Sequence, residues 1–184
     1  MMRKLSKWLA YAWALLRARR HAHALLAAGP VHRARRVLVI CYGNIYRSPF
    51  VAAALRAAAG TPLEIRSAGF HTREGRAVEP GFVDIARNFG IDLSAHRSRL
   101  VRGDDLHWAD LVLIMDGHNY RLMHHHYPEF LAKTLWLGAV SRKTPILIED
   151  PYRRSPDRQR DIACQLDAAC TAFLGQLKPK AAPV

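Results

Sequence analysis

The stretch that begins at Cys41 reads Cys-Tyr-Gly-Asn-Ile-Tyr-Arg-Ser-Pro, which places a thiol and an arginine six residues later just before residues typical of a helix start. A loop that leads into a helix points several unpaired N–H groups at one spot, and the helix dipole adds positive charge there. Such a loop can hold a phosphate dianion without a metal, and the guanidinium of Arg47 can bind two of its oxygens at once. The sequence therefore predicts a phosphate site with a nucleophile at its base.

The positive field of such a loop favours a thiolate over a thiol, so we expect Cys41 to be ionised at neutral pH. A thiolate beneath a bound phosphate can attack phosphorus and form a phosphocysteine, while Arg47 and the loop amides stabilise the equatorial oxygens of the transition state. Gly43 lets the backbone approach the anion closely. The alternative is an inert buried cysteine beside an incidental arginine, which the agreement of the whole stretch disfavours.

The segments around this stretch read as alternating strands and helices. Residues Val37–Ile40 are apolar and rich in β-branched side chains, as in a buried parallel strand, and an alanine-rich helix over Pro49–Ala59 follows with Ser48 at its N-cap. Further strands are predicted at Leu63–Arg66, Leu111–Met115 and Thr134–Leu137, and further helices at Gly81–Asn88, Gly117–His125 and Pro156–Leu177. The predicted fold class is α/β, a four-stranded parallel sheet flanked by helices, with an N-terminal amphipathic helical extension and the ligand at the carboxyl ends of the strands.

Five short motifs occur in a characteristic order along the chain. They are Cys41–Pro49, Ser67-Ala68-Gly69, Ala95-His96-Arg97-Ser98-Arg99, Met115-Asp116 and Asp150-Pro151-Tyr152. This arrangement, over about residues 36–177, resembles the low-molecular-weight protein tyrosine phosphatases. The resemblance implies that Cys41 is the nucleophile, that Arg47 binds phosphate and that Asp150 protonates the leaving phenolate.

The resemblance also implies supporting roles around the loop. Ser48 would hydrogen-bond the thiolate, and Asn44, tied to Ser67 and His96, would hold the loop in its strained shape. The predicted substrate and phosphate-binding residues are Tyr42, Gly43, Asn44, Ile45, Tyr46, Ser48 and Tyr152. From the residues alone, Asp150 reads equally well as a turn aspartate before proline, and a lone His96 as an ordinary surface or core histidine.

The chain departs from the family pattern at two places. Tyr46 stands where members usually carry a second cysteine, so we expect peroxide inactivation of Cys41 to be harder to reverse with a thiol reductant. Thr72, Arg73 and Glu74 occupy the stretch where an aromatic residue usually stacks on phosphotyrosine. Phe70 or His71 could substitute for it, and Arg73 would favour acidic peptide flanks.

Three other functions are alternatives to tyrosine phosphatase activity. Arsenate reductases of this fold need two further cysteines to relay a disulfide, and the only others here, Cys164 and Cys170, lie in the C-terminal helical segment. Protein arginine phosphatases tend to carry threonine where this chain has Ile45, whose apolar side chain suits a phenyl ring better than a guanidinium. The remaining alternative is a catalytically weak phosphate-binding module recruited by its N-terminal helix.

Composition and charge set outer limits on the class of protein. The 184 residues are 50% hydrophobic, enough for one domain with a full core, and three widely spaced cysteines indicate a reducing, cytoplasmic setting. The net charge is +13, but nine of the 28 Lys and Arg lie in residues 1–36, which contain no acid, so we predict no nucleic-acid partner. Consecutive histidines at 124–126 point in different directions on a helix, so no metal and no cofactor are predicted.

The N-terminal segment carries apolar residues at helical spacing, namely Leu5, Trp8, Leu9, Ala12, Leu15 and Leu16. The apolar run Trp8–Leu16 is too short to span a membrane, and the arginines that follow it disfavour a cleaved signal peptide. We predict a basic amphipathic extension at 1–35, a phosphatase domain at 36–178 and a flexible tail at 179–184. Residues 3–20 would contact the inner membrane face, where the partner would be a membrane tyrosine kinase. Alternatively, this segment docks on a partner or on a second copy of the chain. A third alternative is that translation starts further along, so that these residues are never made.

Overall fold

The computed structural model describes residues 16–27, 30–58 and 63–177, and its centre is a sheet of four strands. These are β1 (Arg36–Cys41), β2 (Glu64–Gly69), β3 (Leu111–Ile114) and β4 (Thr134–Trp136). The order across the sheet is β2-β1-β3-β4, and every neighbouring pair is parallel. The predicted four-stranded parallel sheet is confirmed, although β2 continues three residues beyond its predicted end because Ser67, Ala68 and Gly69 pair with β1.

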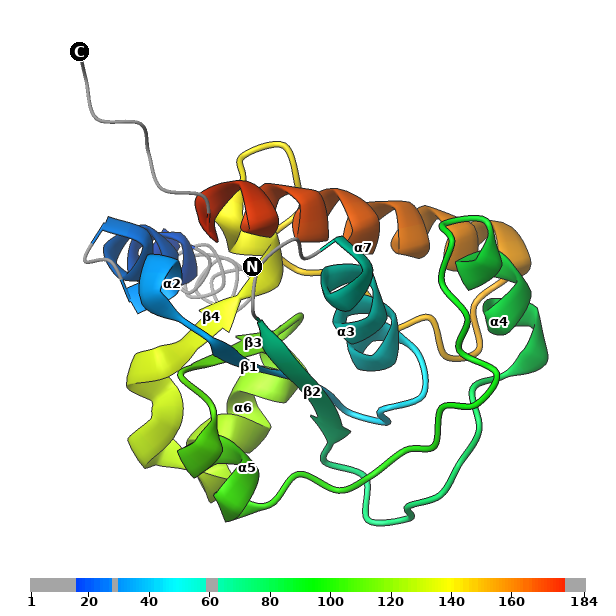
Figure 1. The fold of residues 1–184 in the computed structure, drawn as a ribbon, viewed down its shortest axis with the longest axis horizontal. Helices are drawn as coiled ribbons and strands as arrows, with labels where there is room; N and C mark the ends of the chain where they lie inside the picture. Colours follow the sequence, from blue (N-terminus) through cyan, green and yellow to red (C-terminus); the bar gives the residue numbers. More distant parts are fainter. Residues whose placement is uncertain (1–15, 28–29, 59–62, 178–184) are drawn as a thin grey trace, which may run out of the picture.

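The two faces of the sheet bury different cores, and alternate residues of β1 point to each. Val37 and Val39 belong to the core under α3 (Arg47–Ala58), α4 (Pro80–Arg87) and α7 (Pro156–Leu177). Leu38 and Ile40 belong to the core on the other face, which is covered by α5 (Gly103–Trp108), α6 (Gly117–His126) and the 3-10 helix η1 (Pro128–Lys133). Figure 1 shows α3 and α7 on one side of the sheet and α5 and α6 on the other. The molecule is therefore a three-layer α/β fold, as expected.

The observed helices differ from the predicted ones mainly at their starts and in the short elements. Helix α7 has the predicted bounds, but α3 begins at Arg47, so Ser48 lies inside the first turn rather than at the N-cap. The prediction of Ser48 as N-cap was wrong because its hydroxyl faces the Cys41 sulfur and Asn44 instead of capping the helix. Helix α5, η1 and a second 3-10 helix, η2 (Leu137–Val140), were not predicted because short helices carry little periodicity.

The N-terminal helical residues pack onto the main fold. Residues 16–27 are helical, and a short helix α2 (Pro30–Arg33) follows. Ala22 and Val31 are fully buried in the core that also contains α7, and the ring Nε2 of His21 lies 3.1 Å from the carbonyl oxygen of Thr134. Most of the predicted apolar stripe, from Leu5 to Leu15, lies outside the described residues, and its last member, Leu16, is exposed.

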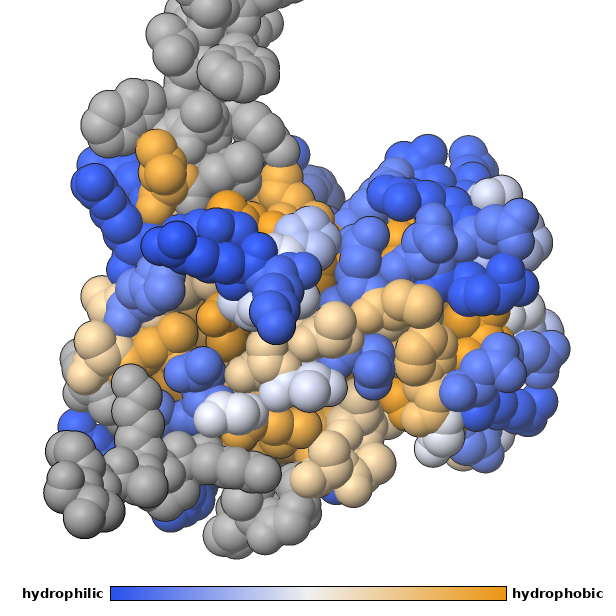
Figure 2. Space-filling view, turned by 90° about the horizontal axis from the view of Figure 1, so that it is seen from above, coloured by the Kyte–Doolittle hydropathy of each residue, from blue (hydrophilic) through white to orange (hydrophobic). Residues whose placement is uncertain are grey.

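The outer surface of α7 is strongly polar at its start. Seen from above, hydrophilic side chains gather at the right of Figure 2, over the first turns of α7. The exposed residues of these turns pair with one another or with the preceding loop, as in the ion pairs Arg160–Asp157 and Arg158–Glu149. Within the described parts of the chain, no helix combines the length and apolar character that crossing a bilayer requires.

Candidate active site

Cys41 is the last residue of β1, and its sulfur faces the loop that leads into α3. The residue is buried, and its sulfur accepts a hydrogen bond from the backbone N–H of Asn44 at 3.2 Å. The hydroxyl of Ser48 lies 3.1 Å from the same sulfur, as the resemblance predicts. A backbone N–H and a hydroxyl thus both contact this sulfur beside the start of α3.

Asn44 holds the loop from within. It is fully buried and adopts the left-handed conformation, with φ of 50°, which is unfavourable for a residue other than glycine. Its side-chain amide donates to the hydroxyls of Ser48 at 2.9 Å and Ser67 at 3.1 Å, and its carbonyl oxygen lies 2.8 Å from the ring Nε2 of His96. The predicted contacts of Asn44 with Ser67 and His96 are both present. A further contact was missed, since the backbone N–H of Arg99 donates to Asn44 Oδ1 at 2.9 Å.

Arg47 lies in the first turn of α3 with its guanidinium almost fully buried. Nη1 donates to the carboxylate of Asp116 and to the carbonyl oxygen of Ile148, and Nη2 donates to the carboxylate of Asp150. Burial by itself lowers the pKa of Arg47, but Cys41 and the two carboxylates outweigh it and raise that pKa. Nε is buried and has no hydrogen-bond partner among the described residues, so the guanidinium keeps a donor for a further acceptor.

Asp150 lies two residues beyond the fully buried Ile148, and its side chain is 38% exposed. Besides contacting Arg47, it accepts a hydrogen bond from the backbone N–H of Tyr152 at 3.1 Å through Oδ1. Asp150 therefore shapes this turn, and the same side chain also contacts Arg47. Glu149 anchors this loop through ion pairs with Arg154 and Arg158.

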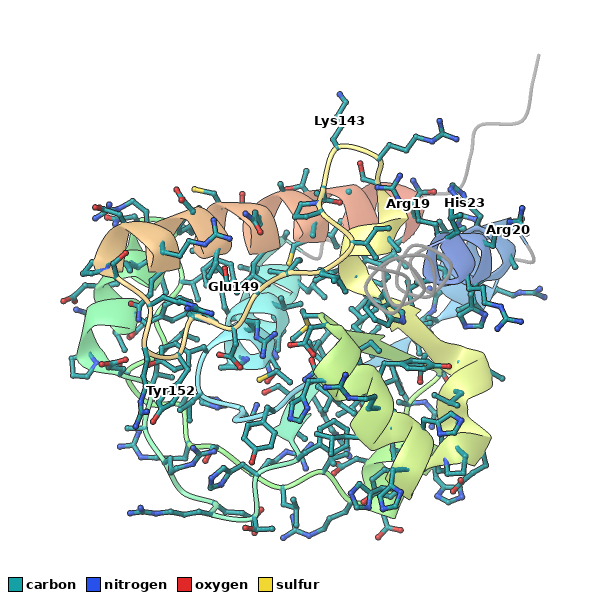
Figure 3. All side chains as sticks on the ribbon, turned by 180° about the vertical axis from the view of Figure 1, so that it is seen from behind. Arg19, Arg20, His23, Lys143, Glu149 and Tyr152 are labelled. Carbon is teal, nitrogen blue, oxygen red and sulfur yellow. The ribbon has the colours of Figure 1, made fainter. Side chains whose placement is uncertain are left out.

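The rim of the site carries aromatic rings and histidines. Tyr42 and Tyr152 are exposed, and Figure 3 shows Tyr152 projecting from the loop that precedes α7. The ring of Tyr42 lies 5.1 Å from that of His118 and 5.6 Å from that of His71. Phe70, the other predicted substitute for the missing aromatic residue, packs against the core on the α6 face. The backbone N–H groups of both candidates donate to the Tyr42 carbonyl oxygen, but it is the His71 ring that packs against the Tyr42 ring.

Tyr46 and Ile45 were predicted to contact the substrate. Both lie in the loop, but their side chains pack into or against the core. Tyr46 is buried, its hydroxyl donates to Glu79, and its ring packs edge-on against Phe82 at 5.1 Å. Burial, followed by the contact with Glu79, raises the pKa of the Tyr46 phenol. Ile45 is partly buried against the core beneath α3. A contribution of Tyr46 to anion binding would therefore come from its backbone.

Three residues that support the site were missed from sequence. Asp116, quoted only as part of a motif, contacts Arg47 and also caps α6 by accepting from the N–H of Asn119. Arg76 donates to the carbonyl oxygen of Gly43 at 2.6 Å, and no sequence signal marks it. Gly69 lies so close to the loop that an added Cβ would be 2.7 Å from the carbonyl oxygen of Tyr42. Its place in the Ser67-Ala68-Gly69 motif was the available signal.

The family model described as low molecular weight phosphotyrosine protein phosphatase matches residues 36–182. The chain belongs to this family. The probable low molecular weight protein-tyrosine-phosphatase EpsP of Ralstonia solanacearum is 30% identical over 142 residues, covering 77% of this chain and 95% of that protein. The family match therefore includes the Cys41 loop and most of the chain around it.

Solved structures of other phosphatases superpose on this fold. The tyrosine phosphatase Wzb from Escherichia coli K30, in complex with sulphate, gives a TM-score of 0.73 at 26% identity, covering 79% of this chain and 99% of that one. The YwlE arginine phosphatase from Geobacillus stearothermophilus gives 0.71 at 27% identity, covering 78% and 92%. A tyrosine phosphatase and an arginine phosphatase thus share the fold of this chain.

Proposed function

We propose that this enzyme hydrolyses phosphotyrosine in proteins through a phosphocysteine formed on Cys41. The observation that carries the proposal is the arrangement around one sulfur: Cys41 Sγ contacts the Asn44 N–H and the Ser48 hydroxyl, and it raises the pKa of the buried Arg47 guanidinium. A nucleophile and a fixed cation are thereby placed at the start of one helix, which is the requirement for in-line attack on a phosphate ester.

In the first step the Cys41 thiolate attacks phosphorus and the bond between phosphorus and the phenolic oxygen breaks. Arg47 and the loop N–H groups hold the three equatorial oxygens, and the carboxyl of Asp150 gives its proton to the leaving phenolate. In the second step water attacks the phosphocysteine, Asp150 takes the proton, and phosphate leaves. Ser48 donates to the sulfur as it departs as a thiolate. The contact of Asp150 with Arg47 keeps the acid at the edge of the phosphate site.

The rim supports an aryl phosphate as substrate. Tyr42 and Tyr152 present exposed rings, and an aromatic ring between them would stack at low cost. Arg153, whose guanidinium lies 5.1 Å from the Tyr152 ring centre, adds positive charge that favours acidic residues around the phosphotyrosine. Because an arginine phosphatase shares this fold, phosphoarginine is the substrate to compare directly.

The remaining alternatives, arsenate reduction and a weak binding module, receive less support. Cys164 and Cys170 both lie on α7, where Cys170 is buried in the core and its burial raises the pKa of the thiol, which disfavours a relay. A binding module has no need of a carboxyl held against the phosphate-binding arginine, as Asp150 is here.

The first test is the hydrolysis of two aryl phosphates. Cys41→Ser should abolish release of phenol from phenyl phosphate and of nitrophenol from p-nitrophenyl phosphate. Asp150→Asn should lower kcat/KM, which reports the first step alone, by about 10²-fold or more on phenyl phosphate and by much less on p-nitrophenyl phosphate, because nitrophenolate leaves without a proton. The exposed Asp84→Asn serves as the matched control. Equal losses on both esters would contradict the assignment of Asp150 as the acid.

The second test distinguishes the substrate classes. Matched peptides that carry phosphotyrosine or phosphoarginine should be separated by kcat/KM, with the phosphotyrosine peptide preferred. Tyr42→Ala should narrow that preference, because it removes a stacking surface without touching the Cys41 sulfur. A higher kcat/KM for phosphoarginine would overturn the substrate assignment and leave the phosphocysteine chemistry standing.

We also propose a cytoplasmic location at the inner membrane face, with a membrane tyrosine kinase as partner. The support is the basic character of the N-terminal helix, where Arg17 and Arg20 are exposed. Figure 3 places Arg19, Arg20 and His23 at the opposite end of the molecule from Tyr152, so that a membrane contacted by this helix leaves the active site accessible.

A further inference from the structure

A second, strongly basic groove lies along the free edge of β2, behind the Cys41 loop. It encloses about 400 Å³, and four arginines line it: Arg56, Arg66, Arg97 and Arg99. Ser67 and His96 also line it. Among the described residues that line it, the only acidic one is Asp105, which accepts a hydrogen bond from Arg99 Nη1 at 2.8 Å. The groove therefore carries a clear excess of positive charge.

The other three guanidiniums of the groove are held in place by neutral partners. Arg56 donates through Nε to the carbonyl oxygen of Ile65 at 3.1 Å, and Arg97 donates to two carbonyl oxygens of its own loop. The Arg66 guanidinium lies 3.9 Å from the centre of the Trp108 ring. Within the described residues, none of these three forms an ion pair with a carboxylate. Arg66 also lies close enough to Asp105 to help lower the pKa of that carboxyl, but the four arginines still outnumber this one carboxylate among the described lining residues, as expected of an anion site.

Arg99 supplies a donor that the protein itself leaves unused. Its Nη2 is buried and has no hydrogen-bond partner among the described residues. A buried donor without an acceptor is costly, so a turn of the Arg99 guanidinium that presents Nη2 to an anion in the groove would relieve that cost. The charge of the groove is also felt by His96: burial lowers the pKa of this imidazole, and Arg56 and Arg97 lower it further, against the contact with Asn44, which raises it.

Asn44 of the Cys41 loop is hydrogen-bonded to three residues that line the groove. Ser67 accepts from the Asn44 amide, His96 contacts its carbonyl oxygen, and the N–H of Arg99 donates to its Oδ1. All three partners line the groove, whereas the N–H of Asn44 donates to the Cys41 sulfur. A ligand that shifts any of these three residues therefore changes the support of the residue that positions the nucleophile.

We propose that this groove binds a small polyanion of the inorganic polyphosphate class, and that its occupancy changes the affinity of the Cys41 loop for a phosphoryl group through Asn44. A single phosphate is too small to reach guanidiniums that surround about 400 Å³, whereas a chain of phosphates presents several charged oxygens to them. The coupling is reciprocal, because two ligands that bias the same element change each other's affinity by the same factor.

The test uses calorimetric titration of the full chain with tripolyphosphate while benzylphosphonate saturates the Cys41 loop. Arg66→Gln/Arg97→Gln removes two exposed charges of the groove, and Arg87→Gln/Arg160→Gln removes two exposed charges from α4 and α7 as the matched control. We expect the tripolyphosphate Kd to weaken at least about tenfold in the groove variant and to stay unchanged in the control. Absence of binding to the unmodified chain, or equal loss in both variants, would refute the site.

The coupling is measured by titrating benzylphosphonate with and without saturating tripolyphosphate. The unmodified chain should show a change in benzylphosphonate Kd that the groove variant lacks, since any effect left in that variant reflects direct competition in the Cys41 loop. An identical response of the two proteins would refute the coupling. Both titrations are independent of turnover, so they stand apart from the assignment of the reaction.

Discussion

Asn44 determines the shape of the active-site loop at the level of single residues. It accepts an unfavourable backbone conformation, and four side chains and one backbone N–H surround it with hydrogen bonds. Strain of this kind persists only where the surroundings over-determine it, and it is common at sites that must be organised before the ligand arrives. The strained backbone conformation of Asn44 therefore helps to direct the N–H groups of the loop toward one point.

We predict that Asn44→Ala lowers both activity and stability. The substitution removes the amide contacts to Ser48 and Ser67 while retaining a positive φ, so the free energy of unfolding should fall by about 2–3 kcal/mol and kcat/KM by at least about tenfold. Thermal unfolding and p-nitrophenyl phosphate kinetics measure the two effects. Asn88→Ala, at an exposed helix end with an ordinary φ of −64°, is the control. Unchanged kinetics in Asn44→Ala would show that the loop holds its shape without this side chain.

At the level of elements, the loop that carries Asp150 depends on a close backbone contact with η2. A Cβ added at Gly138 would lie 2.0 Å from the carbonyl oxygen of Pro145 and 2.8 Å from that of Ile146. These are backbone atoms, which cannot rotate away as the end of a side chain could. The segment before Asp150 can therefore take this path only because position 138 has no side chain.

Gly138→Ala should consequently destabilise the fold and displace the acid. We expect the free energy of unfolding to fall by at least about 1–3 kcal/mol, because the clash is with backbone atoms. We also expect a lower kcat on phenyl phosphate. Gly81→Ala is the matched control, because an added Cβ meets nothing within 4 Å there and alanine favours the α4 helix. Equal melting temperatures for the two variants would contradict the prediction.

A charged contact joins the start of β1 to the loop before β3. Asp110 accepts hydrogen bonds from the side chain and backbone N–H of Arg36 and from the backbone N–H of Arg35. The Arg36 side chain, with these N–H groups, lowers the pKa of Asp110 from its usual value to about 2. A lowered carboxyl pKa contributes stability that is present above about pH 4 and is lost as the pH falls through about 2.

We therefore predict that Asp110→Asn makes the free energy of unfolding less dependent on pH at acidic pH. Between about pH 4 and pH 2 the unmodified protein should lose about 1–2 kcal/mol that the variant does not, after allowing for the partial exposure of the pair. Urea unfolding at pH 2.5, 4 and 7 measures this difference. Asp84→Asn, in an exposed pair on α4, should follow the unmodified protein. An equal dependence on pH in Asp110→Asn and the unmodified protein would contradict the assignment.

At the level of the whole molecule, local sequence patterns predicted much of the architecture. They did not predict the contacts between segments that are distant in the sequence. The strands at Val37–Ile40 and Leu111–Met115 were found because parallel strands buried on both faces are continuously apolar. The contacts of Arg76 with Gly43 and of Tyr46 with Glu79 were not, because each joins segments about thirty residues apart that carry no shared pattern. The Asn44 contacts were anticipated only through the family resemblance.

The N-terminal helix shows how an element that reads as an extension can also belong to the core. Ala22 is fully buried and Ala18 nearly so, one turn apart, while Arg17 and Arg20 on the same helix are exposed. Removal of the residues before Val31 would therefore uncover part of the core as well as remove charge. A truncated chain cannot separate a membrane contact from a loss of stability.

Charge substitution tests the membrane proposal more directly. Arg17→Gln/Arg20→Gln should reduce co-sedimentation with vesicles containing phosphatidylserine, because each basic residue near an anionic surface contributes about 1 kcal/mol, or roughly fivefold in partitioning. The Arg87→Gln/Arg160→Gln control lowers the net charge equally at the other helices and should bind as the unmodified chain does. Binding should also weaken as salt rises, and Ala22 should stay buried in both variants because neither touches the packed face. Equal partitioning of all three proteins, or binding to neutral vesicles alone, would rule out an electrostatic contact through this helix.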